Sequence, residues 1–184
     1  MKKFSRSARV LTGTAVAATL AAGTFGALSA NAASPKAAPA AAPAATAKGH
    51  TTQSTHLTIE SATKAAKAAL DAAKKSDQRV SVAVVDRNGN TVVTLRGDGA
   101  GPQSYDSAVQ KAYTSVSWNA PTSELAGRLK DAPNLKDIPH TLFLAGGAPV
   151  AVKGAPIAGI GVAGAPSGDL DERFAQAGVA ALGR

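Results

Sequence analysis

Few side chains in this sequence are suited to catalysis or metal binding. The chain has no Cys, its only Met is the initiator, and its three His are His50, His56 and His140. Thiolate and thioether ligands are therefore excluded from any metal site in a chain that lacks Met1. His140 follows Pro139, and no spacing links it to a Ser and an acid, so nucleophilic catalysis is not indicated.

Residues 96–101 read RGDGAG and permit three interpretations. Arg96-Gly97-Asp98 spells an adhesion tripeptide, and the three Gly resemble the start of a phosphate-binding loop. A dinucleotide fingerprint, however, needs G-x-G-x-x-G after a strand of a parallel unit, and position 102 is Pro. The third interpretation, a connector between a strand and a helix, is therefore favoured.

Three acids, Asp169, Asp171 and Glu172, lie close together near the C-terminus. Carboxylates stabilise the first turn of a helix, where the backbone amides carry partial positive charge. A zinc site would need three or four ligands, and we find no His or acid pair at helical spacing to supply them. We expect these acids to begin a helix.

The elements that position these residues follow from periodicity. A helix begins after Thr58, which is a suitable N-cap, and Asn88-Gly89 joins two β-branched runs in a hairpin. Helices are predicted at about 103–118, from Pro121, and from Asp169 to Leu182. The strings TLFLA, PVAVKG and IAGIGVAGA predict three more strands. The order α-ββ-αα-βββ-α indicates an α+β fold with an antiparallel sheet flanked by helices.

The helix at 103–118 has two distinct faces. Tyr105, Val109, Ala112 and Val116 form an apolar stripe, which we expect to face the core. On the opposite face lie Ser107, Lys111, Thr114 and Trp118. A site on this second face would lie at the surface of one subunit or be closed by a neighbouring one.

The first 55 residues differ from the rest. Residues 1–32 combine a basic start, an apolar run and the cleavage signal Ala30-Asn31-Ala32, which predicts a secretory signal peptide. An uncleaved membrane anchor is the alternative. Residues 33–55 are rich in Ala, Pro, Thr and Ser and predict a flexible linker. We expect residues 56–184 to form one domain of a secreted, extracellular protein that is not inserted in a membrane after cleavage.

Charge excludes one class of partner. The whole chain has a net charge of +8, but loss of residues 1–32 leaves 16 basic and 12 acidic residues, a net charge of +4. A net charge this small does not indicate the strongly basic surface that nucleic-acid-binding proteins use to contact phosphates.

Several motifs in fixed order resemble one family, the GlcG/HbpS-like haem-binding proteins, whose domain also occurs at the C-terminus of PduO-type enzymes. The resemblance covers about residues 57–183, and the signal peptide and spacer are most similar to the secreted HbpS-type branch. The motifs are VVDRNGNTVVTLRGDGAGPQSYDSAVQKAYTS, PTSEL, GGAPV, GAPIAGIGVAGA and DLDERFAQAG.

The resemblance implies a profilin-like fold with a five-stranded antiparallel sheet, and a ring-like homo-oligomer, commonly an octamer. It also implies haem (haem b) as the ligand, a membrane sensor kinase as partner in redox sensing, and in some members slow haem degradation. Cytoplasmic relatives have less clear roles, so family membership alone does not settle the ligand.

The resemblance also implies a site. Thr114 matches the threonine that the secreted members place at the haem iron, with Tyr113 and then His140 as alternative ligands. Lys111 lies one helical turn from Thr114 and is expected to meet a propionate, and Trp118 to stack on the porphyrin. Arg96 matches the family's Arg-x-Asp-Gly-Ala turn and would pair with Asp98 or border the ligand. No catalytic residue is predicted.

Two other functions remain open at this point. One is an enzyme acting on a small molecule, of the corrinoid-related kind associated with the PduO-linked domain. Export and the lack of acid–base pairs count against it. The other is an oligomeric interaction protein with no ligand.

Overall fold

The structure is a computed structural model, and it describes residues 49–183. The predicted signal peptide at 1–32 and most of the predicted linker lie outside the described residues.

Four strands form one antiparallel sheet in the order β2-β1-β4-β3. The strands are β1 (Ser81–Asp86), β2 (Thr91–Arg96), β3 (Gly147–Val152) and β4 (Ala155–Ala163). The predicted antiparallel sheet with flanking helices is confirmed, but the five-stranded sheet is wrong, since TLFLA forms no strand. The Leu142 amide and the Phe143 side chain instead attach this segment to the helix at 103–118, below the sheet.

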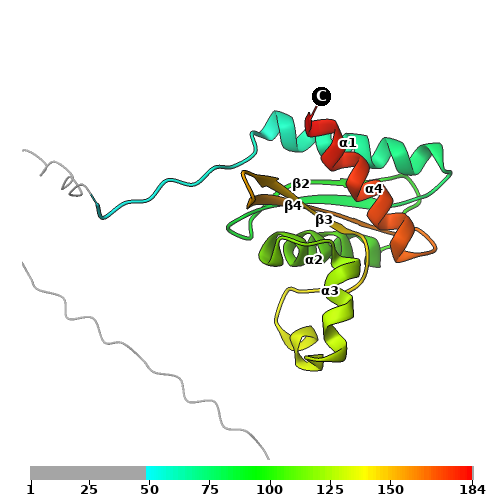
Figure 1. The fold of residues 1–184 in the computed structure, drawn as a ribbon. Helices are drawn as coiled ribbons and strands as arrows, with labels where there is room; N and C mark the ends of the chain where they lie inside the picture. The colour runs from blue at the N-terminus through cyan, green and yellow to red at the C-terminus, as the bar shows by residue number, and fades with distance from the viewer. Residues whose placement is uncertain (1–48, 184) are drawn as a thin grey trace, which may run out of the picture. The chain divides into compact units, whose positions relative to one another are not determined.

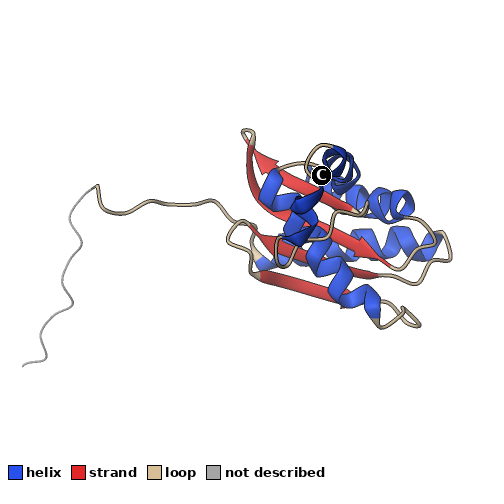
Figure 2. Cartoon of the chain, turned by 90° about the horizontal axis from the view of Figure 1, so that it is seen from below, coloured by secondary structure: helices blue, strands red, loops and turns tan. Residues whose placement is uncertain are grey.

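Helices cover both faces of the sheet (Figure 1). On one face lie α1 (Ile59–Lys75) and α4 (Gly168–Ala180), and on the other lies α2 (Gln103–Trp118), followed by the short α3 (Thr122–Gly127). Figure 2, viewed from below, shows helices overlying the strands of the sheet. The bounds of α2 are those predicted, because the connector at 97–102 and the left-handed Asn119 end the helix at both sides.

Alternation along β1 explains why both faces of the sheet are buried. Val82 and Val84 point to the α1–α4 side and join the larger core cluster, while Ala83 and Val85 point to α2. Five buried Ala on α1 allow that helix to lie close to its neighbours: Ala62, Ala65, Ala66, Ala69 and Ala73. At its N-terminus the predicted cap forms, since the Thr58 side chain accepts a hydrogen bond from the Ser61 amide.

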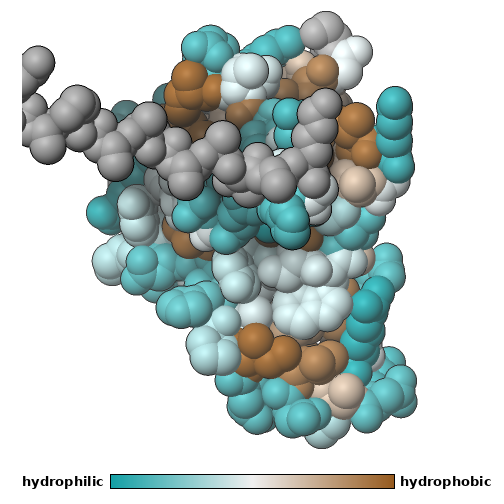
Figure 3. Space-filling view, turned by 90° about the vertical axis from the view of Figure 1, so that its left-hand side faces the viewer, coloured by the Kyte–Doolittle hydropathy of each residue, from teal (hydrophilic) through white to brown (hydrophobic). Residues whose placement is uncertain are grey.

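A small lobe projects below α2. It contains α3 and the 3₁₀ turns Arg128–Lys130 and Pro133–Asp137. Ala120, Leu125 and Phe143 form its own buried cluster. Figure 3 shows brown, apolar surface on this lower part of the molecule.

The hairpin tip between β1 and β2 is organised by Asp86. Its carboxylate accepts hydrogen bonds from the Asn88 amide (2.8 Å) and from the amide and side-chain nitrogens of Asn90 (2.9 and 3.1 Å). Partial burial raises the pKa of Asp86, but these hydrogen bonds together outweigh it and hold the pKa below its ordinary value.

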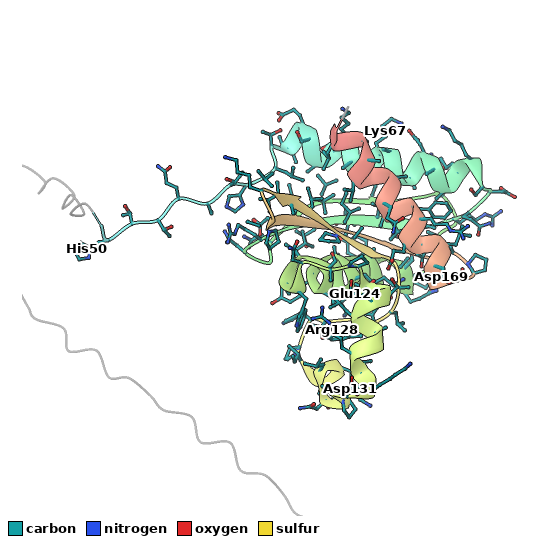
Figure 4. The ribbon with its side chains drawn as sticks, viewed as in Figure 1. His50, Lys67, Glu124, Arg128, Asp131 and Asp169 are labelled. Atoms are coloured by element: carbon teal, nitrogen blue, oxygen red, sulfur yellow. The ribbon has the colours of Figure 1, made fainter. Side chains whose placement is uncertain are left out.

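We predict that Asp86→Ala lowers the free energy of unfolding by about 1–2 kcal/mol at pH 7, because charge-assisted hydrogen bonds are lost. A lowered folded-state pKa means that this stabilisation is present above the unfolded pKa, about 3.9, and is lost as pH falls through the folded value. Urea denaturation at pH 7 and pH 2 would therefore show a difference between the two proteins that shrinks in acid. Exposed Asp131, labelled in Figure 4, supplies the control Asp131→Ala, which should change the free energy of unfolding at pH 7 by less than about 0.5 kcal/mol. A difference independent of pH would contradict the assignment.

Candidate functional site

A cavity of about 450 Å³ lies between the first three turns of α2 and the tip of the β1–β2 hairpin. Its volume is in the range of small-molecule sites. The hairpin contributes Gly89 and Thr91, and His140 comes from the segment before β3. The helix contributes the rest: Tyr105, Asp106, Val109, Gln110 and Tyr113.

The apolar wall of this cavity is a stripe of α2. Tyr105, Val109 and Tyr113 are spaced four residues apart, so they lie above one another on one face of the helix. The sequence pattern predicts a buried Tyr105, but this residue is 45% exposed. The face of α2 that contacts the sheet carries Ala108 and Ala112, because only small side chains fit there. Ala112 and Val116 of the predicted stripe are therefore buried as expected, whereas Tyr105 and Val109 are not.

Gly89 closes the cavity at the hairpin tip. It has φ of +87°, and a Cβ at this position would lie 2.8 Å from Cε2 of Tyr113. A glycine is required here for two reasons, the left-handed turn and the close approach of the Tyr113 ring. The hairpin tip and α2 are therefore in direct contact beside the cavity.

His140 faces Tyr113 across the cavity wall. Their ring centroids are 6.3 Å apart with an interplanar angle of 63°. His140 is exposed and has φ of +66°, the left-handed region that residues with a Cβ seldom adopt. It lies in a turn in which the amide and hydroxyl of Thr141 both donate to the Ile138 carbonyl, at 3.3 and 2.7 Å. Two of the predicted iron ligands, Tyr113 and His140, are thus brought together.

Thr114 lies behind this wall. The helical pattern predicts it on a surface face of α2, but it is fully buried. Its hydroxyl donates to the Gln110 carbonyl and accepts from the Leu142 amide, both at 2.8 Å. The helix lies between the sheet and the segment at 138–145, so the face that looks solvent-exposed in the sequence is covered.

Lys111 is also buried, and its predicted surface location is wrong. Its ammonium lies 2.9 Å from the Asp171 carboxylate and donates to the Val162 carbonyl at 3.1 Å. Burial raises the pKa of Asp171, while the hydrogen bond and charge of Lys111 act in the opposite direction. Lys111 thus connects α2 to α4 and does not line the cavity.

Trp118 and Arg96 lie apart from the cavity as well. Trp118 packs edge-on against Phe143 in the lower lobe, with ring centroids 5.3 Å apart. Arg96 donates to the Ala100 carbonyl at 2.7 Å, within the connector that precedes α2. Among the described residues, no hydrogen bond or ion pair joins the Arg96 guanidinium to Asp98, and Arg96 does not line the cavity.

The acids at the start of α4 are structural. Asp171 and Glu172 are buried, and only Asp169 remains exposed, as Figure 4 illustrates. Glu172 accepts from the Ser123 amide (2.9 Å) and hydroxyl (2.6 Å), which ties α4 to α3. Sequence reasoning missed these roles, although Asp171 lies four residues before buried Ala175, on the same helix face.

Two features are absent from residues 49–183. No group of three or more His, Cys, Asp or Glu there is arranged to hold a metal ion. No helix in this range is long and apolar enough to cross a membrane.

Known proteins resemble this chain over its folded part. A crystal structure of a double mutant of Streptomyces reticuli HbpS is 75% identical, covers 79% of this chain and all of that one, and superposes with a TM-score of 0.77. A crystal structure of a PduOC:heme complex is 26% identical over 69% of this chain and 95% of its own, with a TM-score of 0.63.

An uncharacterised 15.0 kDa Citrobacter freundii protein, from the dhaT-dhaS intergenic region, is 31% identical over 113 residues, or 59% of this chain and 80% of that protein. The sequence profile of the family described as haem degrading protein HbpS-like matches residues 57–180. The family predicted from the motifs is confirmed, and this chain belongs to the HbpS-like family.

Proposed function

We propose that this protein binds haem in the cavity beside α2, with His140 as the iron ligand and Tyr113 next to it. The observation that carries the proposal is that the cavity brings together an imidazole and a phenol, both of which bind haem iron in proteins. The family and the relative whose structure is a heme complex support the same ligand.

The residues of the cavity fit a porphyrin. Tyr105, Val109 and the Tyr113 ring provide an apolar wall from one helix. Of the described residues that line the cavity, Asp106 is the only acid, and none is Lys or Arg. Solvent, and not a Lys or Arg of the cavity, would therefore hydrate the two propionates of a bound haem. Haem held there would supply a redox-active iron.

His140 is a better ligand candidate than Thr114. The His140 ring is exposed at the cavity, whereas the Thr114 hydroxyl is buried and already has a donor and an acceptor. Iron ligation by Thr114 would require both hydrogen bonds to break and the 138–145 segment to move. His140 needs no such rearrangement.

We predict that titration of hemin into the protein gives a saturable change in the Soret band, and that His140→Ala weakens binding at least about tenfold, the equivalent of about 1.4 kcal/mol. Tyr113→Phe keeps the ring against Gly89 and should change the affinity less than about threefold. His50 lies on the extended segment before α1 (Figure 4), so His50→Ala is the matched control and should bind as the wild type does.

Two results would contradict this proposal. A wild-type protein without saturable binding would exclude haem as the ligand. Equal affinities of the His140→Ala and His50→Ala proteins would exclude His140 as the iron ligand.

Export and assembly are further proposals, supported by the sequence and by family membership. We propose that the chain is secreted after cleavage behind Ala32, which N-terminal sequencing of protein from the culture medium would test.

We also propose that the protein forms a homo-oligomer, an octamer by resemblance. Light scattering would test this assembly, and a measured mass equal to that of a single chain would contradict it.

A redox-sensing role with a membrane sensor kinase, haem b as the haem type, and slow oxidative haem degradation also remain proposals. They are supported by the resemblance to secreted HbpS-type proteins. Cross-linking in cells would test the kinase contact, and the Soret band followed in the presence of peroxide would test degradation. A stable Soret band would contradict degradation.

A further inference from the structure

We infer that Thr114 is a positioning residue, whose buried hydroxyl holds the segment at 138–145 on α2 and thereby places His140 at the cavity. The inference rests on the proposed haem site, because it explains how that site is built. It concerns the protein without haem as well, so it can be tested separately.

The hydroxyl of Thr114 makes two hydrogen bonds, one within α2 and one to the segment at 138–145. It donates to the carbonyl of Gln110 in its own helix and accepts from the Leu142 amide, 28 residues away in sequence. Both donor–acceptor distances are 2.8 Å, and Thr114 has no exposed surface. This hydrogen bond is part-buried, and the Thr114 hydroxyl is the partner that the Leu142 amide has on α2.

The next residue of the segment makes a second contact with α2. Phe143 is buried and packs edge-on against Trp118, which lies one helical turn after Thr114. Two consecutive residues, Leu142 and Phe143, are thus attached to two consecutive turns of one helix. Two attachment points determine the direction of the segment as well as its position.

His140 depends on this attachment. It lies two residues before Leu142 and has φ of +66°, a backbone conformation that is unfavourable for a residue with a Cβ. Such a conformation persists where surrounding contacts hold it. Because Tyr113 directly precedes Thr114, the residue that holds the segment is adjacent to the residue that the His140 ring contacts.

The two roles of Thr114 predict different behaviour. As an iron ligand it would act on haem directly, whether or not His140 is present. As a positioning residue it acts only through His140, and its loss is detectable before haem is added.

The test compares Thr114→Val, which removes the hydroxyl, with Thr114→Ser, which keeps it. Ser117→Ala is the matched control, since the Ser117 hydroxyl bonds to the Tyr113 carbonyl at 2.7 Å in the same way but does not reach the segment. Amide hydrogen exchange of Leu142 is measured in each haem-free protein. Hemin affinity is then measured for the single variants and for Thr114→Val combined with His140→Ala.

We expect exchange at Leu142 at least about tenfold faster in Thr114→Val and unchanged in Thr114→Ser and Ser117→Ala. Hemin binding should weaken about fivefold or more in Thr114→Val, but by less than twofold when His140 is already Ala. Non-additivity of this kind identifies residues that act through one another.

Unchanged Leu142 exchange in Thr114→Val would overturn the inference, as would an equal loss of affinity with and without His140. If the wild-type protein binds no hemin, the proposed function fails, and the exchange measurements alone still decide whether Thr114 holds the segment. Circular dichroism spectra that match the wild type ensure that the variants are compared as folded proteins.

Discussion

Asp171→Asn is expected to lower the free energy of unfolding by about 3–5 kcal/mol, because it leaves the Lys111 ammonium buried without its counter-charge. The side chains of Lys111 and Asp171 are only 6% and 4% exposed, so water cannot replace the lost partner. Urea denaturation at pH 7 would measure the change.

Two further variants make this prediction specific. Asp169→Asn changes a carboxylate in the same first turn of α4, but this one is exposed (Figure 4), so a loss below about 1 kcal/mol is expected. Lys111→Met combined with Asp171→Asn removes both charges and should recover most of the lost stability, since a buried ion pair is commonly replaceable by neutral side chains. Equal stabilities of the two Asp→Asn variants would contradict the buried ion pair.

Gly161→Ala is expected to destabilise the protein by about 3 kcal/mol or more, because the added methyl has no space. A Cβ at this position of β4 would overlap the Ala108 carbonyl oxygen and lie 2.5 Å from the Ala112 amide nitrogen. Both atoms belong to the backbone of α2, so relief requires the helix to move away from the sheet. Urea denaturation measures the loss, and hemin titration reports whether the cavity on α2 changes with it.

Gly127→Ala is the control for this substitution. Gly127 lies in α3, and a Cβ added there would meet no atom of another element within 4 Å, so Ala should be neutral or stabilise the helix by up to about 1 kcal/mol. A similar stability of the two Ala variants would show that α2 does not lie as close to β4 as the structure places it.

Gly161 also shows why α2 can lie so close. It pairs with Ala83 on β1 and with Gly147 on β3, so the row of the sheet beneath the helix has almost no side chains. A Cβ on Gly147 would overlap the Lys111 carbonyl oxygen. The sequence of β4 predicts a strand rich in small residues, but the alignment of these residues with those of two other strands depends on register, which is a tertiary property.

Local signals predict much of the fold. The hairpin at Asn88-Gly89, the cap at Thr58 and the full extent of α2 each depend on residues close in sequence, and all are present. The prediction of a strand at TLFLA is wrong because an apolar run of five residues is equally typical of a strand and of a buried loop. Pairing decides between the two, and Leu142 and Phe143 contact α2 instead of a neighbouring strand.

The candidate site also depends partly on local sequence and partly on tertiary contacts. The sequence by itself determined that Lys111, Tyr113, Thr114 and Trp118 lie on one helix, because helical hydrogen bonds join residues four apart. Only the tertiary structure decided which of them face the cavity, since this depends on partners far along the chain: Asp171 for Lys111, Leu142 for Thr114 and His140 for Tyr113. A polar residue that looks solvent-facing in a helical pattern is buried when such a partner compensates its charge or hydrogen bonds.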